Sequence, residues 1–171
     1  MPRHGFTNKS YILNKIAQND LIELRAISNF YYNLNGIYER ACNHFAFLYR
    51  YDWYVAPDIN DSEIKQEKIL KDFSKILTYL DNSNLKQLLG DIALKVVKNG
   101  CYYGYIIDSP TELCLQELPP EYCRVRYSVG TFPAVEFNMR FFDDKFSDPV
   151  YRLKVINMFP DDFKKGYMLY R

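Results

Sequence analysis

Residues 84–100 read NLKQLLGDIALKVVKNG, and residues 101–126 continue as CYYGYIIDSPTELCLQELPPEYCRVR. The first of these two segments carries apolar residues every three or four positions, which predicts an amphipathic helix. Asn84 and Gln87 have the spacing of a capping box at its start, and Gly100 suits the left-handed conformation that ends many helices. We therefore expect a helix over 84–99, with Leu89 and Ile92 in the middle of its buried stripe.

The segment after this helix has the pattern of a β-hairpin. An aromatic run, Cys101–Ile107, is followed by turn-forming residues at 108–112 and by a second apolar run, Leu113–Leu118. Further on, residues 134–142 alternate apolar and polar side chains, which predicts a half-buried strand. We expect the helix to pack on the strands 101–107 and 134–142.

Upstream of residue 84 the pattern is helical, and it predicts helices at 21–34, 37–49 and from about 60 to 80. Residues 150–157 fit either a strand or the start of a helix. Helices followed by strands are typical of an α+β fold with a small antiparallel sheet. We expect an amino-terminal arm at 1–19 and a single α+β domain at 20–171, helical to about 99 and strand-rich from about 100.

Three segments resemble the portal (head-tail connector) proteins of tailed bacteriophages, in particular those of phages that infect low-GC bacteria. They are LRAISNFYY with GIYER at 24–40, YRYDWY with Pro57 at 49–57, and DIALKVVKNG through YYGYII, Leu118-Pro119 and Tyr122-Cys-Arg124 at 91–124. The resemblance spans roughly residues 24–142. It implies a wing-like region of a portal subunit, since portal subunits continue into stem helices and a clip, and this chain stops at Arg171. We therefore expect an amino-terminal piece.

The resemblance also implies a function without catalysis or cofactors. Portal subunits form a homo-oligomeric ring, typically a dodecamer, at one capsid vertex of the virion, and they assemble in the host cytoplasm. Double-stranded DNA passes through the ring during packaging and genome ejection. Capsid protein, the packaging motor and head-completion proteins dock on it.

The charge of the chain is balanced, with 22 Lys and Arg against 21 Asp and Glu and a net charge of +1. Dedicated nucleic-acid modules have a basic face and a high pI. The composition therefore disfavours strong DNA binding by these 171 residues.

Aromatic residues make up 17% of the chain, with 16 Tyr, 12 Phe and one Trp. Aromatic residues are enriched at protein interfaces, so this excess fits an oligomer or a docking surface. A genome rich in A and T would also raise the number of Tyr and Phe codons. Tyr49, Tyr51 and Trp53 share one side of the segment if it is extended, and they are candidate subunit contacts, with base stacking as the alternative.

Arg124 and Arg126 alternate with apolar residues and are predicted to share one face of a strand. They could contact phosphates or pair with Glu117 or Glu136 on neighbouring strands, and cross-strand ion pairs are the commoner outcome. A nucleic-acid-binding phage accessory protein is the alternative function that these arginines would serve.

A second alternative is a small metal-dependent phage enzyme that uses the carboxylates near the carboxyl terminus: Asp143, Asp144, Asp148, Asp161 and Asp162. Two-metal enzymes need carboxylates that converge from separate rigid elements, whereas these five lie in a turn and at a predicted helix start. The sequence also lacks the G-x-x-x-x-G-K-[ST], G-x-G-x-x-G and G-x-S-x-G motifs. We predict no metal site and no catalytic residue.

Histidine and cysteine usage predicts no further site. His44 and Cys42 are two residues apart in a predicted helix, and this spacing directs their side chains away from each other. The four cysteines have neither a C-x-x-C motif nor a regular framework, which favours reduced thiols. No apolar run approaches the roughly 20 residues that a membrane-spanning helix needs.

Overall fold

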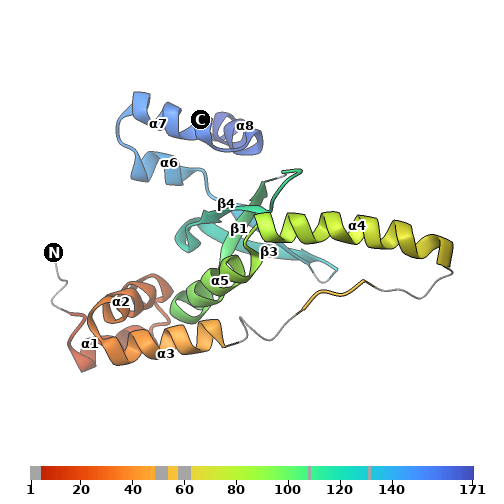
Figure 1. The fold of residues 1–171 in the computed structure, drawn as a ribbon. Coiled ribbons are helices and arrows are strands. Elements are labelled where there is room, and N and C mark those ends of the chain that lie inside the picture. Colours follow the sequence, from red (N-terminus) through yellow and green to blue (C-terminus); the bar gives the residue numbers. More distant parts are fainter. Residues whose placement is uncertain (1–4, 49–53, 58–62, 108, 131) are drawn as a thin grey trace. The chain divides into compact units, whose positions relative to one another are not determined.

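The computed structural model describes residues 5–48, 54–57, 63–107, 109–130 and 132–171 (Figure 1). As the sequence predicted, it is an α+β fold in which helices precede small antiparallel sheets. The chain divides into two compact units, whereas we had expected one domain after the arm. Unit 1 comprises residues 1–102 and 108–114, and unit 2 comprises residues 103–107 and 115–171.

Unit 1 contains five helices in its described residues: α1 (Lys9–Ala17), α2 (Leu21–Leu34), α3 (Gly36–Phe47), α4 (Glu63–Asn82) and α5 (Leu85–Asn99). Helices α2, α3 and α5 pack on one another, and α1 packs on α2 (Figure 1). Side-chain caps begin three of them, because Asn8, Asp20 and Asn35 each accept a hydrogen bond from a backbone N–H of the first turn.

The end of α5 is fixed by side chains of α2. Gly100 has φ +74°, the left-handed conformation expected of it. The carbonyl oxygens of the last turn lack partners within a helix. Arg25 Nε donates to the carbonyl oxygen of Asn99 at 3.0 Å, and Ser28 Oγ donates to that of Lys98 at 2.6 Å. Sequence-distant residues therefore set the position of α5 within unit 1.

The start of α5 corrects the predicted capping box. Asn84 has φ +44° and its side chain makes no capping hydrogen bond. Its carbonyl instead accepts hydrogen bonds from the N–H groups of Gln87 and Leu88. Asn tolerates the left-handed region, so this residue forms the turn between α4 and α5.

The predicted burial of α5 is also corrected. Leu89 is 46% exposed, and the buried residue of the helix is Gly90. A methyl group at Gly90 would lie 2.6 Å from Cδ1 of Phe47, so glycine permits the close approach of α3. Within unit 1, α5 packs on α2 and α3 through this small face and leaves part of its leucine stripe outside.

Unit 2 holds two two-stranded sheets and three helices in its described residues. Strands β1 (Tyr103–Ile107) and β2 (Cys114–Leu118) pair in one sheet, and β3 (Cys123–Val129) and β4 (Phe132–Phe137) form the other, with η1 (Pro120–Tyr122) between β2 and β3. Cys114 itself falls in unit 1. The pairing of β3 with β4 is antiparallel and is interrupted by an irregularity between Val125 and Tyr127.

Residues 138–171 lie in the region expected to be strand-rich, but they form helices; for residues 150–157 we had expected either a strand or the start of a helix. The structure has α6 (Arg140–Lys145), α7 (Pro149–Met158) and α8 (Asp161–Tyr170) there. The predicted strand at 134–142 ends at Phe137, because Asn138 Oδ1 accepts from Arg140 N and begins a helix. Asp148 then caps α7, with Pro149 at the first helical position.

These helices carry the core of unit 2. The buried residues of this core are Leu118, Phe142, Ile156, Phe163 and Tyr167. Partly buried side chains from β1, β3 and β4 pack around them. Aromatic rings supply most of this core and meet edge to face, which is a favourable arrangement for ring pairs.

Candidate interaction surfaces

The candidate subunit contacts Tyr49, Tyr51 and Trp53 lie outside the described residues. Their predicted role therefore stays a prediction.

Arg124 and Arg126 lie exposed on β3, beside Glu136 of β4. Arg126 Nη1 is 3.1 Å from Glu136 Oε1, which confirms the ion pair for this arginine. Arg124 is opposite Glu136 in the strand register and makes no ion pair within the described part of the chain. It lines a shallow pocket of about 520 Å³ together with Glu121 and Tyr122. One free cation between two glutamates gives no basic surface.

We expect DNA binding by this chain to be weak and non-specific. Affinity falls with salt in proportion to the phosphates neutralised, and β3 offers one arginine that is not already paired. A fluorescence anisotropy titration with a labelled duplex should show little binding at about 150 mM salt. Tight binding there, reduced in Arg124→Ala but not in Lys71→Ala, would instead support the nucleic-acid-binding alternative.

The five carboxylates considered for metal binding are each engaged locally. Asp143 pairs with Arg152, Asp144 with Arg140, and Asp161 with Lys164. Asp148 caps α7, and Asp162 accepts from the Tyr105 hydroxyl at 2.9 Å. Among the described residues, no group of three His, Cys, Asp or Glu could hold a metal ion. These side chains therefore stabilise helix starts and the α6–α8 cluster.

The structure separates the side chains of Cys42 and His44, as their spacing in the helix predicted. Cys42 is buried in α3, whereas His44 is exposed and stacks edge to face beside Phe45. All four cysteines are free thiols. None of the helices in the described ranges is long and apolar enough to span a bilayer.

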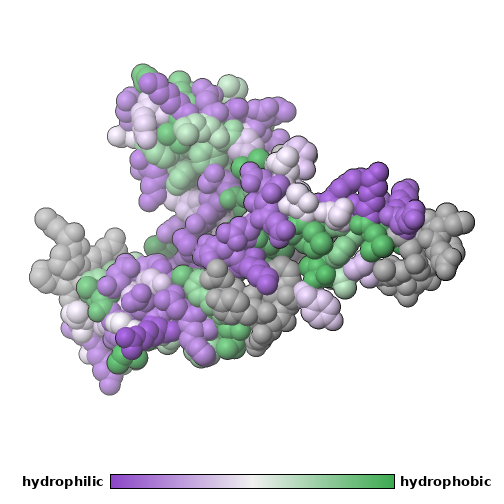
Figure 2. All heavy atoms as spheres, in the orientation of Figure 1, coloured by the Kyte–Doolittle hydropathy of each residue, from purple (hydrophilic) through white to green (hydrophobic). Residues whose placement is uncertain are grey.

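Helix α4 presents an apolar stripe that its own unit leaves open. The stripe consists of Ile69, Leu70, Phe73, Ile76, Leu77 and Leu80. Leu70 and Ile76 are each 51% exposed. Figure 2 shows hydrophilic side chains along one side of α4 and hydrophobic ones along the other. The sequence revealed this stripe by its period, but period alone does not say whether a stripe is covered.

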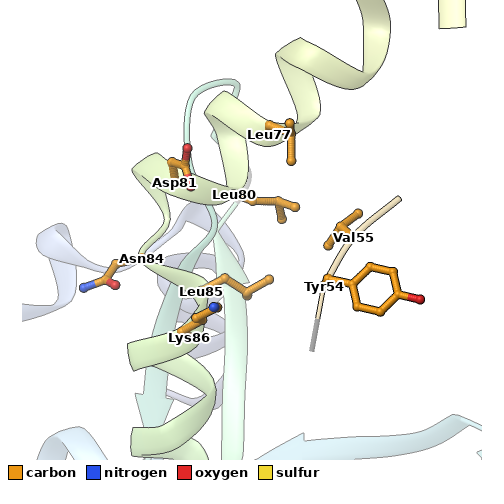
Figure 3. A pocket seen from close by; sticks show the side chains of 8 residues that line it. All are labelled: Tyr54, Val55, Leu77, Leu80, Asp81, Asn84, Leu85 and Lys86. Atoms are coloured by element: carbon orange, nitrogen blue, oxygen red, sulfur yellow. The ribbon is translucent and has the colours of Figure 1, made fainter. Parts of the chain in front are cut away.

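The carboxyl-terminal end of this stripe opens into a pocket of about 330 Å³ (Figure 3). Its apolar wall consists of Leu77 and Leu80 of α4 and Leu85 of α5, with Tyr54 and Val55 opposite them. The remaining lining residues are polar: Asp81, Asn84 and Lys86. The pocket is large enough for one or two apolar side chains and is open to solvent.

Helix α7 is apolar on two opposite faces. Its inner face buries Ile156, while the outer face exposes Val150, Tyr151, Leu153 and Met158. A helix that is apolar all round is expected to be buried on all sides. The pattern of residues 150–157 fits both a strand and the start of a helix, so it does not predict this surface. Asp148-Pro149 was the helix-start signal that could have found it.

No family model, curated protein or solved structure matches this chain.

Proposed function

We propose that this chain is a non-enzymatic structural subunit that associates with copies of itself. The observation that carries the proposal is the amount of apolar surface that the two units leave exposed. The exposed side chains on α4 and on the outer face of α7 are contiguous along each helix, unlike the scattered apolar residues of an ordinary surface. Contiguous apolar patches of this kind are typical of interaction sites.

The resemblance in segments 24–40, 49–57 and 91–124 gives the finer form of the proposal. In that form the chain is the amino-terminal part of a portal subunit, in a ring at the capsid vertex through which genomic DNA passes. Its role would be geometric: a packed helical and aromatic scaffold that positions channel-forming elements. Local use of the Asp143–Asp162 carboxylates supports a role without hydrolysis.

Sedimentation velocity over a range of micromolar concentrations tests the coarser proposal. We expect the average sedimentation coefficient of the purified chain to rise with concentration, because apolar surface is then removed from water. Negative-stain electron microscopy of the largest species tests the finer proposal, for which closed rings are expected. A chain that stays monomeric throughout contradicts self-association, and open or two-fold particles contradict the ring.

A further inference from the structure

The outer face of α7 carries a single cation within its apolar surface. Lys154 lies between Val150 and Met158 at helical spacing, and Met158 is 84% exposed. Lys154 makes no ion pair with any described residue. A partner that covers this face must therefore bury apolar side chains and offer a carboxylate, since a buried unpaired ammonium is costly.

Helix α4 has those two properties. Its apolar stripe is flanked on one side by Glu67, Ser74 and Asp81, which recur every seven residues. Neither carboxylate makes an ion pair with a described residue. Three of the four lysines of α4, Lys68, Lys71 and Lys75, lie on the face of the helix opposite the stripe. One border of the stripe is thus acidic.

Pairing of α4 with α4 of a second copy is disfavoured by this charge arrangement. In an antiparallel two-fold pair, the same flank of both helices meets, and the midpoint of the stripe places Glu67 opposite Asp81 of the other copy. Like charges facing each other across an interface cost free energy. The partner of α4 must then be a different surface of the second copy.

We infer that α4 of one copy packs against the outer face of α7 of a second copy. Lys154 pairs with the acidic flank of α4, with Asp81 as its main partner, and Met158 enters the pocket beside Leu77 and Leu80 (Figure 3). An unbranched thioether fills irregular apolar pockets well. This inference rests on the proposed self-association and names its surfaces.

The contact has the symmetry that a ring requires. Each copy contributes α4 to one neighbour and α7 to the other, so the contact is head-to-tail, and such contacts close into rings or continue as filaments. At 1.5 Å per residue, α7 is about 15 Å long and the stripe from Ile69 to Leu80 is about 17 Å long, so α7 covers most of the stripe. A ring in which every copy uses both helices leaves neither apolar face open.

A charge exchange tests the pairing in the full chain by sedimentation velocity. We expect Lys154→Glu and Asp81→Lys each to weaken self-association by about tenfold, and Met158→Glu by more than tenfold. The double variant Lys154→Glu with Asp81→Lys should recover self-association to within about threefold of the original chain. Circular dichroism confirms that each variant folds.

Two control variants isolate the surfaces. Lys71→Glu changes charge on the opposite face of α4, and Leu169→Glu places a carboxylate at an exposed apolar position of α8. Neither should alter self-association. One outcome is that the original chain associates while the double variant loses as much association free energy as the two single variants together. In that case the α4–α7 contact is wrong and the proposed function stands. A chain that is monomeric at every concentration overturns both. Should Met158→Glu fail to fold, Leu70→Glu on α4 makes the same test.

Discussion

Phe142→Ala should remove a large part of the free energy of unfolding of unit 2. Phe142 is 0% exposed, and its ring centroid lies 5.1 Å from that of Phe159 and 5.6 Å from that of Tyr167. Truncation of a buried Phe costs about 3–5 kcal/mol, from lost burial and from the cavity that remains. A unit of this size is expected to have only about 3–9 kcal/mol of stability in total.

Urea unfolding followed by near-ultraviolet circular dichroism measures this loss. The matched control is Phe45→Ala, because Phe45 of α3 is exposed and its truncation should change the unfolding midpoint little. Equal midpoints for Phe142→Ala and Phe45→Ala would contradict the placement of the core. That outcome would show that the aromatic core does not provide the main stabilisation of unit 2.

Local signals in the sequence were sufficient for the helical part of unit 1. The helical period placed α2 to α5, and Gly100 ends α5 as predicted. The N-cap predicted at Asn84 was wrong because Asn suits both an N-cap and a left-handed turn, and only the path of the chain from α4 to α5 decides between them. The predicted burial of Leu89 was wrong because the close packing at Gly90 turns the helix toward Phe47.

The end of the chain was harder to predict because its pattern is shared by two structures. Residues 134–142 alternate like a strand, yet Phe141 and Phe142 belong to a helix whose aromatic side chains pack on α7 and α8. Tertiary packing overrides local preference in such cases. The exposed apolar face of α7 depends on the same packing. It is recognised only once Arg152 and Ile156 are known to be buried on the other face.

Contacts within a hairpin could be predicted from the sequence, whereas contacts among separate helices could not. The cross-strand pair of Arg126 with Glu136 follows from the hairpin, which sequence patterns can predict. Asp143, Arg152 and Tyr167 come together only when α6, α7 and α8 are packed. No spacing in the sequence predicts this cluster. This cluster is a structural network, and the loss of its arginine should destabilise unit 2.

Arg152→Met should destabilise unit 2 strongly, although Met keeps an unbranched apolar stem like that of Arg. Arg152 is 8% exposed, and its guanidinium pairs with Asp143 at 2.6 Å. It also donates hydrogen bonds to the carbonyl oxygens of Phe146 at 2.7 Å and Ser147 at 3.3 Å. Its loss removes the nearest cation from the Asp143 carboxylate and the donor from two carbonyl oxygens, and breaking such a pair is costly. We expect the melting temperature to fall by roughly 10 °C.

The matched control is Arg140→Met, which removes an exposed arginine from its surface pair with Asp144. Exposed pairs contribute little, so the melting temperature of this variant should stay close to that of the original chain. Similar melting temperatures for Arg152→Met and the original chain would show that the network does not hold α6, α7 and α8 together.

The pH dependence of stability reports the same network through Asp143. The Tyr167 hydroxyl donates to Asp143 at 2.7 Å, and together with the nearby Arg171 and Arg152 it lowers the pKa of this carboxyl below its ordinary value. A lowered pKa in the folded state means that the contribution is complete above about pH 3.9, the pKa of an unperturbed Asp, and is lost as pH falls through the folded-state pKa. Asp143→Asn keeps an acceptor for Tyr167 but cannot titrate. Its urea midpoint should therefore start lower at pH 7 and fall less between pH 5 and pH 2 than that of the original chain. Parallel pH profiles for the two proteins would show that Asp143 does not stabilise the fold through its charge.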